Sequence, residues 1–243
     1  MLNSAKTQCI FIGNRQLLAR IPPNTTINFN GDILHPSCYV KNLGVYIDRY
    51  MVFDVHVSEL TKKVNGILMY INRIGELFDK QTRVTVVQSL VLSLIEYCIR
   101  IWGTTNETLL SNVQKIQNFA AKVAIGGARK RDHVSPIFKE LQWLKIKQAH
   151  EFYVCTTMYK ILRGFYPDWL FTGIFNTVHD VTNNVTRWNK KLYVPRSKTQ
   201  SGDRRLAVLG AKLWNSLPPA VTQTHSQSSF KAALKKLILA NNA

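Results

Sequence analysis

The chain has 243 residues, of which 32 are Lys or Arg and 14 are Asp or Glu, so its formal net charge is +18. Apolar residues make up 46% of it, with 5 Trp, 9 Tyr and 11 Phe, which excludes a disordered basic tail. No apolar run reaches the roughly 18 residues of a membrane helix, and the first residues lack the features of a secretory signal. We therefore expect a folded intracellular protein, nuclear or cytoplasmic, that is neither secreted nor embedded in a membrane.

The basic charge is concentrated in the second half of the chain. Residues 1–120 carry a net charge of +4, and residues 121–243 carry +14. A positive field of this kind attracts polyanions, which indicates RNA or DNA as the partner. A basic surface that only confers solubility is the alternative interpretation.

Taken in chain order, residues 5–48 show the features of strands and turns. Short β-prone runs cover residues 7–12, 25–29 and 39–47, and Asn30-Gly31 is typical of a tight hairpin. From residue 54 the apolar period changes to steps of three and four. This change predicts an amphipathic helix that runs to Phe78, with Asp54 as its N-cap.

Further helices are expected along the rest of the chain. Residues 84–101, which follow Asp79 as a cap, are apolar on nearly every side and predict a central helix. Helices are also expected from Asn106 to a stop at Gly126-Gly127, up to Leu141, and over residues 145–163, 206–217 and 230–237. The predicted fold class is mainly α with a small N-terminal β-rich part (α+β), in three regions: 1–50, 51–127 and 128–243.

Two basic stretches are candidates for nucleic-acid contact. The first is a loop with Arg129, Lys130 and Arg131. The second is the polar loop 176–205, which surrounds Trp188 and Tyr193 with Arg187, Lys190, Lys191, Arg196, Lys198, Arg204 and Arg205. Basic side chains neutralise phosphates and aromatic rings stack on unpaired bases. The alternative is a solvated loop whose aromatic side chains fold back onto the helices.

No catalytic or metal-binding pattern stands out. The acidic residues are scattered without an Asp-Asp or Asp-x-Asp pair, so a two-metal centre is not expected. The histidines lack metal-ligand spacing, no Gly-rich phosphate loop occurs, and the four cysteines are far apart, which predicts free thiols. We expect no catalytic residue, no metal and no cofactor.

Several segments occur in an order that is familiar from one family. They are Leu2-Asn-Ser-Ala-Lys-Thr7, Val40-Lys-Asn-Leu-Gly-Val-Tyr-Ile-Asp48, Leu94-Ile-Glu-Tyr-Cys-Ile-Arg-Ile-Trp-Gly103, Val113-Gln-Lys-Ile-Gln-Asn-Phe119, Leu213-Trp-Asn-Ser-Leu-Pro218 and Ser228-Ser-Phe-Lys231. In this order the chain resembles the reverse transcriptases of LINE-type, non-LTR retrotransposons, downstream of the catalytic Asp pair. The family is an RNA-directed DNA polymerase that uses Mg²⁺.

The resemblance implies a palm remnant in residues 1–50, a helical thumb in 51–127 and a basic C-terminal region in 128–243. Lys6 would remain from a palm motif, and Leu43 with Gly44 would be the primer-grip-like turn. Because thumb helices contact the template-primer duplex, the resemblance assigns that role to Lys62, Lys63 and Arg73. The family's catalytic aspartates would precede residue 1, so we expect a truncated, non-polymerising element protein.

Three functions remain open from the sequence. The first is residual binding of nucleic acid, either template and primer or the element RNA, without enzymatic activity. The second is a split polymerase in which this chain supplies the thumb to a palm-containing polypeptide. The third is a protein-interaction module without a nucleic-acid role, which would use apolar surface exposed on the strands of residues 5–48.

Overall fold

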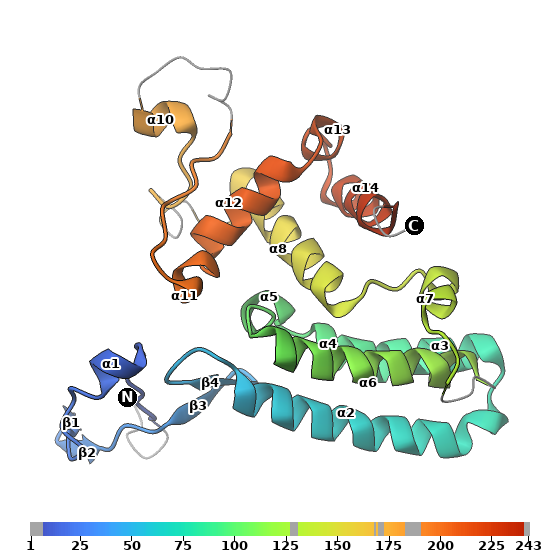
Figure 1. The fold of residues 1–243 in the computed structure, drawn as a ribbon, viewed down its shortest axis with the longest axis horizontal. Coiled ribbons are helices and arrows are strands. Elements are labelled where there is room, and N and C mark those ends of the chain that lie inside the picture. Colours follow the sequence, from blue (N-terminus) through green and yellow to red (C-terminus); the bar gives the residue numbers. More distant parts are fainter. Residues whose placement is uncertain (1–6, 127–130, 168, 170–172, 183–190, 241–243) are drawn as a thin grey trace. The chain divides into compact units, whose positions relative to one another are not determined.

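The computed structural model describes residues 7–126, 131–167, 169, 173–182 and 191–240 (Figure 1). The chain divides into two compact units, Met1–Ile146 and Lys147–Ala243. Helices dominate both units, and the strands form two small antiparallel sheets in the first unit. The predicted fold class, mainly α with a small N-terminal β-rich part, is confirmed.

Each of the two sheets is a hairpin. Strand β1 (Ile27–Phe29) pairs with β2 (Asp32–Leu34), and β3 (Tyr39–Asn42) pairs with β4 (Val45–Asp48). The first turn is Asn30-Gly31, with φ values of 52° and 90°, as the sequence predicts. Positive φ at both turn residues suits the right-handed twist of the paired strands.

The strand expected over residues 7–12 is wrong. Residues 7–14 contain no strand, and a short helix, α1 (Arg15–Leu18), follows them with Asn14 as its N-cap. The segment makes only isolated backbone contacts, for example Ser37 N to Cys9 O at 2.9 Å. A β-prone run forms a strand only where a neighbouring strand offers a continuous ladder, and the described part of the chain offers none here.

Helix α2 (Asp54–Ile74) begins one residue earlier than its predicted cap would place it. The N-cap position is Phe53, which has φ of 62° and makes no side-chain cap bond, so Asp54 is already helical. The buried carboxylate of Asp48 accepts backbone N–H bonds from Tyr50, Val52 and Phe53 just ahead of the helix. Asp48, at the end of β4, therefore joins the second hairpin to α2.

The single central helix expected over residues 84–101 is wrong in two respects. The segment contains α3 (Lys80–Val87), a π-helical stretch η3 (Gln88–Leu92) and α4 (Ser93–Glu96), then a break at Tyr97 and Cys98 before α5 (Ile99–Trp102). It is also not covered all round, since Leu90 is half exposed. Cys98 has φ of 52°, and Trp102 Nε1 donates to the Tyr97 carbonyl across the break.

Helix α6 (Glu107–Ile125) lies alongside both α2 and α3 (Figure 1). Asn106 caps its start. As predicted, Asp79 caps α3, and Gly126 ends α6 with φ of 68°. The core of this unit is formed mainly by apolar side chains of α2, the α3–α5 run and α6. Its members include Val57, Val64, Leu68, Ile71, Val87, Val91, Ile95, Ile99, Trp102, Val113, Ala120 and Ala124.

Helix α7 (Ser135–Leu141) and the residues after it pack on α6. The buried Gln117 side chain donates to the Leu144 carbonyl at 2.8 Å, and Gln114 Oε1 accepts from Ile146 N at 2.9 Å. These bonds place residues 135–146 in the first unit.

The second unit contains a long helix, α8 (Ile146–Leu162), whose first residue belongs to the first unit, and several shorter ones. They are α10 (Val178–Thr182), α11 (Gln200–Asp203), α12 (Leu206–Ser216), α13 (Pro219–Thr222) and α14 (Gln227–Ala240). Tyr159 stacks on Phe230 with 4.5 Å between ring centroids, and Trp214 stacks on the same ring at 5.9 Å. In the described part of both units, no helix is long and apolar enough to cross a bilayer.

Candidate nucleic-acid interface

Helix α2 turns a continuous face toward solvent. At 100° per residue, a helix with a buried stripe at Val57, Val64 and Ile71 directs a second set of side chains the opposite way. We call this set the α2 outer face: Lys62, Lys63, Gly66, Met69, Tyr70 and Arg73. All three cations assigned to nucleic-acid contact on this helix therefore lie on one exposed face.

The three cations differ in their partners. Lys62 Nζ lies 2.8 Å from Glu59 Oε1 on the same helix, and this hydrogen bond, with the Glu59 charge, raises the pKa of Lys62. Exposed pairs of this kind contribute little to stability and are readily exchanged. Lys63 and Arg73 make no ion pair within the described part of the chain. Lys63 and Arg73 are therefore the cations of this face whose charge is not neutralised by an ion pair among the described residues.

Gly66 occupies the centre of the α2 outer face. A Cβ added there would meet no heavy atom within 4 Å, so no neighbouring element requires a glycine. A glycine inside an exposed helix costs about 0.5–1 kcal/mol relative to alanine. Gly66 leaves the α2 backbone open to solvent beside Met69 and Tyr70, which are 51% and 65% exposed.

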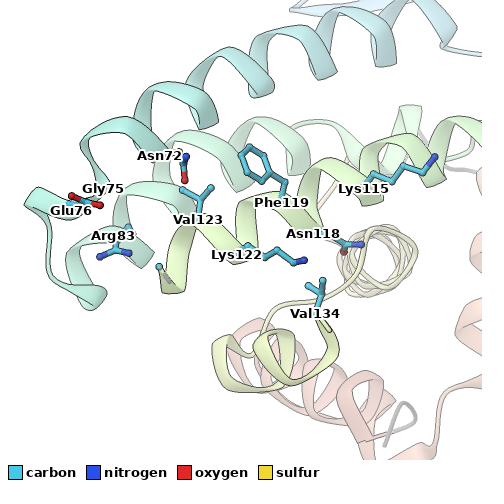
Figure 2. A pocket seen from close by; sticks show the side chains of 11 residues that line it. Asn72, Gly75, Glu76, Arg83, Lys115, Asn118, Phe119, Lys122, Val123 and Val134 are labelled. Carbon is cyan, nitrogen blue, oxygen red and sulfur yellow. The ribbon is translucent and has the colours of Figure 1, made fainter. Parts of the chain in front are cut away.

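A pocket of about 760 Å³ lies at the C-terminal end of α2 (Figure 2). Its walls come from the end of α2, the 3₁₀ turn η2 (Gly75–Leu77), α3, α6 and the residue before α7. The lining includes three cations, one acid and two amides. The lining residues are Asn72, Gly75, Glu76, Arg83, Lys115, Asn118, Phe119, Lys122, Val123, Gly126 and Val134.

Arg83 is held at one end of this pocket. Its Nη2 donates to the Phe78 carbonyl at 3.0 Å, while its buried Nε has no hydrogen-bond partner in the described structure. A Cβ on Gly126 would stand 1.5 Å from Arg83 Nη1. Gly126 is therefore required both by its φ of 68° and by the guanidinium that lies against it.

The primer-grip-like residues form the turn of the second hairpin. Leu43 and Gly44 have φ of 46° and 85°, and the Leu43 side chain is 83% exposed. Tyr97 Oη donates to the Leu43 carbonyl at 2.6 Å, which joins the turn to the break before α5. The structure thus brings two segments of the family-like motif order into contact.

The C-terminal basic residues are only partly described. Lys191 and Tyr193 flank Leu192, whose backbone N–H and carbonyl both bond the side-chain amide of Asn215. Arg196, Lys198 and Arg205 are exposed, and Arg204 is half-buried. Arg187, Trp188 and Lys190, like Arg129, Lys130 and Lys6, lie outside the described residues; Arg131 is exposed.

The described residues hold no group of three or more His, Cys, Asp or Glu side chains that could bind a metal ion. All four cysteines are free thiols, as predicted. The residues that the sequence reasoning missed are Arg83, Lys115 and Lys122. Their only signal was that Lys115 and Lys122 lie seven residues apart on the polar side of a predicted helix.

Comparison of the chain with protein-family models, with curated proteins and with solved structures gives no match.

Proposed function

We propose that this protein binds a nucleic-acid duplex through the α2 outer face, as the thumb-like helix of a LINE-type reverse-transcriptase-like protein. The chain does not polymerise by itself in this proposal. The observation that carries it is Gly66, an exposed helix-interior glycine with open space around it and cations one and two turns away.

The spacing of the face suits a charged strand. From Lys62 to Arg73 the helix rises about 16 Å. Phosphates recur every 3.4 Å along each strand of a duplex, so this length reaches several of them. Gly66 lets the duplex approach the helix backbone, and the exposed Tyr70 and Met69 offer apolar contact to sugars and base edges.

One variant tests the positive charge of the α2 outer face, and a second tests the close approach of the duplex to the helix at Gly66. We expect Lys63→Ala with Arg73→Ala to make the slope of log affinity against log salt shallower by about 1.8 for duplex. We expect Gly66→Leu to weaken duplex binding while leaving the unfolding midpoint unchanged or higher, because leucine favours helix. Lys139→Ala with Lys235→Ala, two exposed cations elsewhere, is the control of equal charge.

Two results would contradict the proposal. One is duplex binding that is unchanged in both the charge variant and Gly66→Leu. The other, which concerns polymerisation alone, is Mg²⁺- or Mn²⁺-dependent primer extension by the purified chain.

A second candidate, a protein-binding module, is supported by apolar side chains exposed in the first 50 residues. Ile12, Leu17 and Ile33 are each more than half exposed, and so is Leu43. Isolated exposed apolar residues are common, but several on one small region are typical of an interaction site. A purified chain that sediments as a monomer and binds no apolar dye would exclude this candidate.

A further inference from the structure

We infer that the pocket between η2, α3, α6 and the start of α7 binds a short single-stranded segment of nucleic acid. This site begins at Asn72, next to Arg73 of the α2 outer face but about 100° further round the helix, and the inference goes beyond the duplex contact proposed there. It shares with that proposal only the class of partner.

The first argument is the line of positive charge through the pocket. Lys115 and Lys122 both line it from α6, separated by two helical turns, or about 10 Å (Figure 2). Gly126, against which the Arg83 guanidinium lies, follows one turn later. A single phosphate cannot reach all three cations, whereas successive phosphates of one strand can.

The balance of charge in the pocket also favours an anion. Glu76 is the one acid among the lining residues, and it forms no ion pair with Arg83, Lys115 or Lys122 in the described structure. Lys115 has an exposed side chain without an ion-pair partner among the described residues. Lys115 lies in a recess, where a cation holds a phosphate more strongly than the same cation on a flat surface.

The second argument is the uncharged lining. Phe119 is half-buried and lies on the side of α6 that faces Asn72 of α2, and Asn118 lines the pocket from another side of α6 (Figure 2). An aromatic ring next to basic groups is the arrangement on which unpaired bases stack, and side-chain amides donate to and accept from base edges. An acidic peptide would use the cations but would leave the ring and the amides without a role.

The third argument is size. A volume of about 760 Å³ falls within the range of about 300–1,000 Å³ typical of small-ligand pockets. A pocket of this size has room for a short single-stranded segment. The ligand that we infer is a single strand, either a free end or an unpaired stretch beside a duplex.

The experiment measures binding of a labelled single-stranded oligonucleotide across a range of salt concentrations. Three phosphate contacts in the pocket give a log-log slope of about −2.1, and Lys115→Gln with Lys122→Gln should remove about 1.4 of it. Phe119→Leu should weaken binding about tenfold with little change in slope, since it removes stacking and no charge. Lys139→Gln with Lys235→Gln is the control of equal charge, and circular dichroism shows whether each variant folds.

The outcomes separate this inference from the proposed function. Weaker single-strand binding in the pocket variants supports the inference, even if the α2 variants leave duplex binding unchanged and the proposed function fails. Single-strand affinity and slope that are unchanged in both folded pocket variants would overturn it. Displacement of the oligonucleotide by a mononucleotide or an acidic peptide at equal concentration would also overturn it.

Discussion

His56, near the start of α2, is a buried side chain whose chemistry depends on pH. It is 6% exposed and lies beside Trp102, with 5.8 Å between ring centroids. Its Nε2 has no hydrogen-bond partner in the described structure, and burial lowers the pKa of its imidazole. The folded protein therefore favours the neutral ring.

We expect the first unit to lose stability as the pH falls from about 6.5 toward 5. In that window the unfolded chain binds a proton on His56 that the folded chain does not. The free energy of unfolding therefore decreases as the pH decreases. The slope stays below the one-proton limit of about 1.4 kcal/mol per pH unit. Urea unfolding between pH 5 and 7.5 should show this slope reduced in His56→Phe and kept in His225→Phe, an exposed control. Equal slopes in both variants would contradict the role of His56.

At the scale of the element, the two hairpins use the same turn with different residues. The first has Asn30-Gly31 and the second Leu43-Gly44, with nearly equal φ at the first position, 52° and 46°. Asparagine tolerates this left-handed conformation, whereas leucine is strained in it. The leucine is 83% exposed, so burial does not compensate for that strain.

We predict that Leu43→Asn raises the free energy of unfolding by about 0.5–1 kcal/mol, because it relieves a strained φ and buries nothing. The Tyr97 hydrogen bond should persist, since its acceptor is the backbone carbonyl of residue 43. Asn30→Leu is the reciprocal variant and should lower stability by a similar amount. Chemical denaturation measures both changes, and destabilisation by Leu43→Asn would disprove the strain.

The first hairpin turn and helices α2 and α6 could be predicted because their signals are local. A turn pair such as Asn30-Gly31, or an apolar stripe with a cap such as Asn106, specifies its element without distant partners. The run 84–101 could not be predicted correctly. Its apolar composition shows that it is buried in part, but the break at Tyr97 and Cys98 depends on contacts made by Tyr97 with a hairpin more than fifty residues earlier.

The candidate sites divide in the same way. Lys62, Lys63 and Arg73 share a face that the helical period alone defines, so the sequence was sufficient to group them. The pocket joins Arg83 of α3 to Lys115 and Lys122 of α6, and their proximity follows from packing and from the missing side chain at Gly126. The spacing of these three residues in the sequence does not predict that they line one pocket.

At the scale of the whole molecule, both units are basic. Residues 1–146 hold 18 Lys and Arg against 10 Asp and Glu, a net charge of +8, and residues 147–243 hold 14 against 4, a net charge of +10. The shorter unit therefore has the higher charge density. Charges outside a binding site act through the long-range field, which salt screens within about 8 Å at physiological ionic strength.

We predict that Lys231→Gln with Lys236→Gln, both on α14, slows nucleic-acid association several-fold at 10 mM salt and by less than about twofold at 150 mM. The dissociation rate should stay constant, because long-range charge affects encounter more than the bound contact. Stopped-flow measurements at both salt concentrations test this. A faster dissociation rate would show instead that these lysines contact the ligand.

The division of the chain after Ile146 also has a consequence during synthesis. Residues 1–146 form a compact unit of their own, so its core can form while the following 97 residues have yet to be translated. At about 5–20 residues per second, that interval lasts about 5–20 s, whereas small domains typically fold within microseconds to seconds. The α2 outer face and the pocket can thus form on the ribosome, beside RNA, before the more basic second unit emerges.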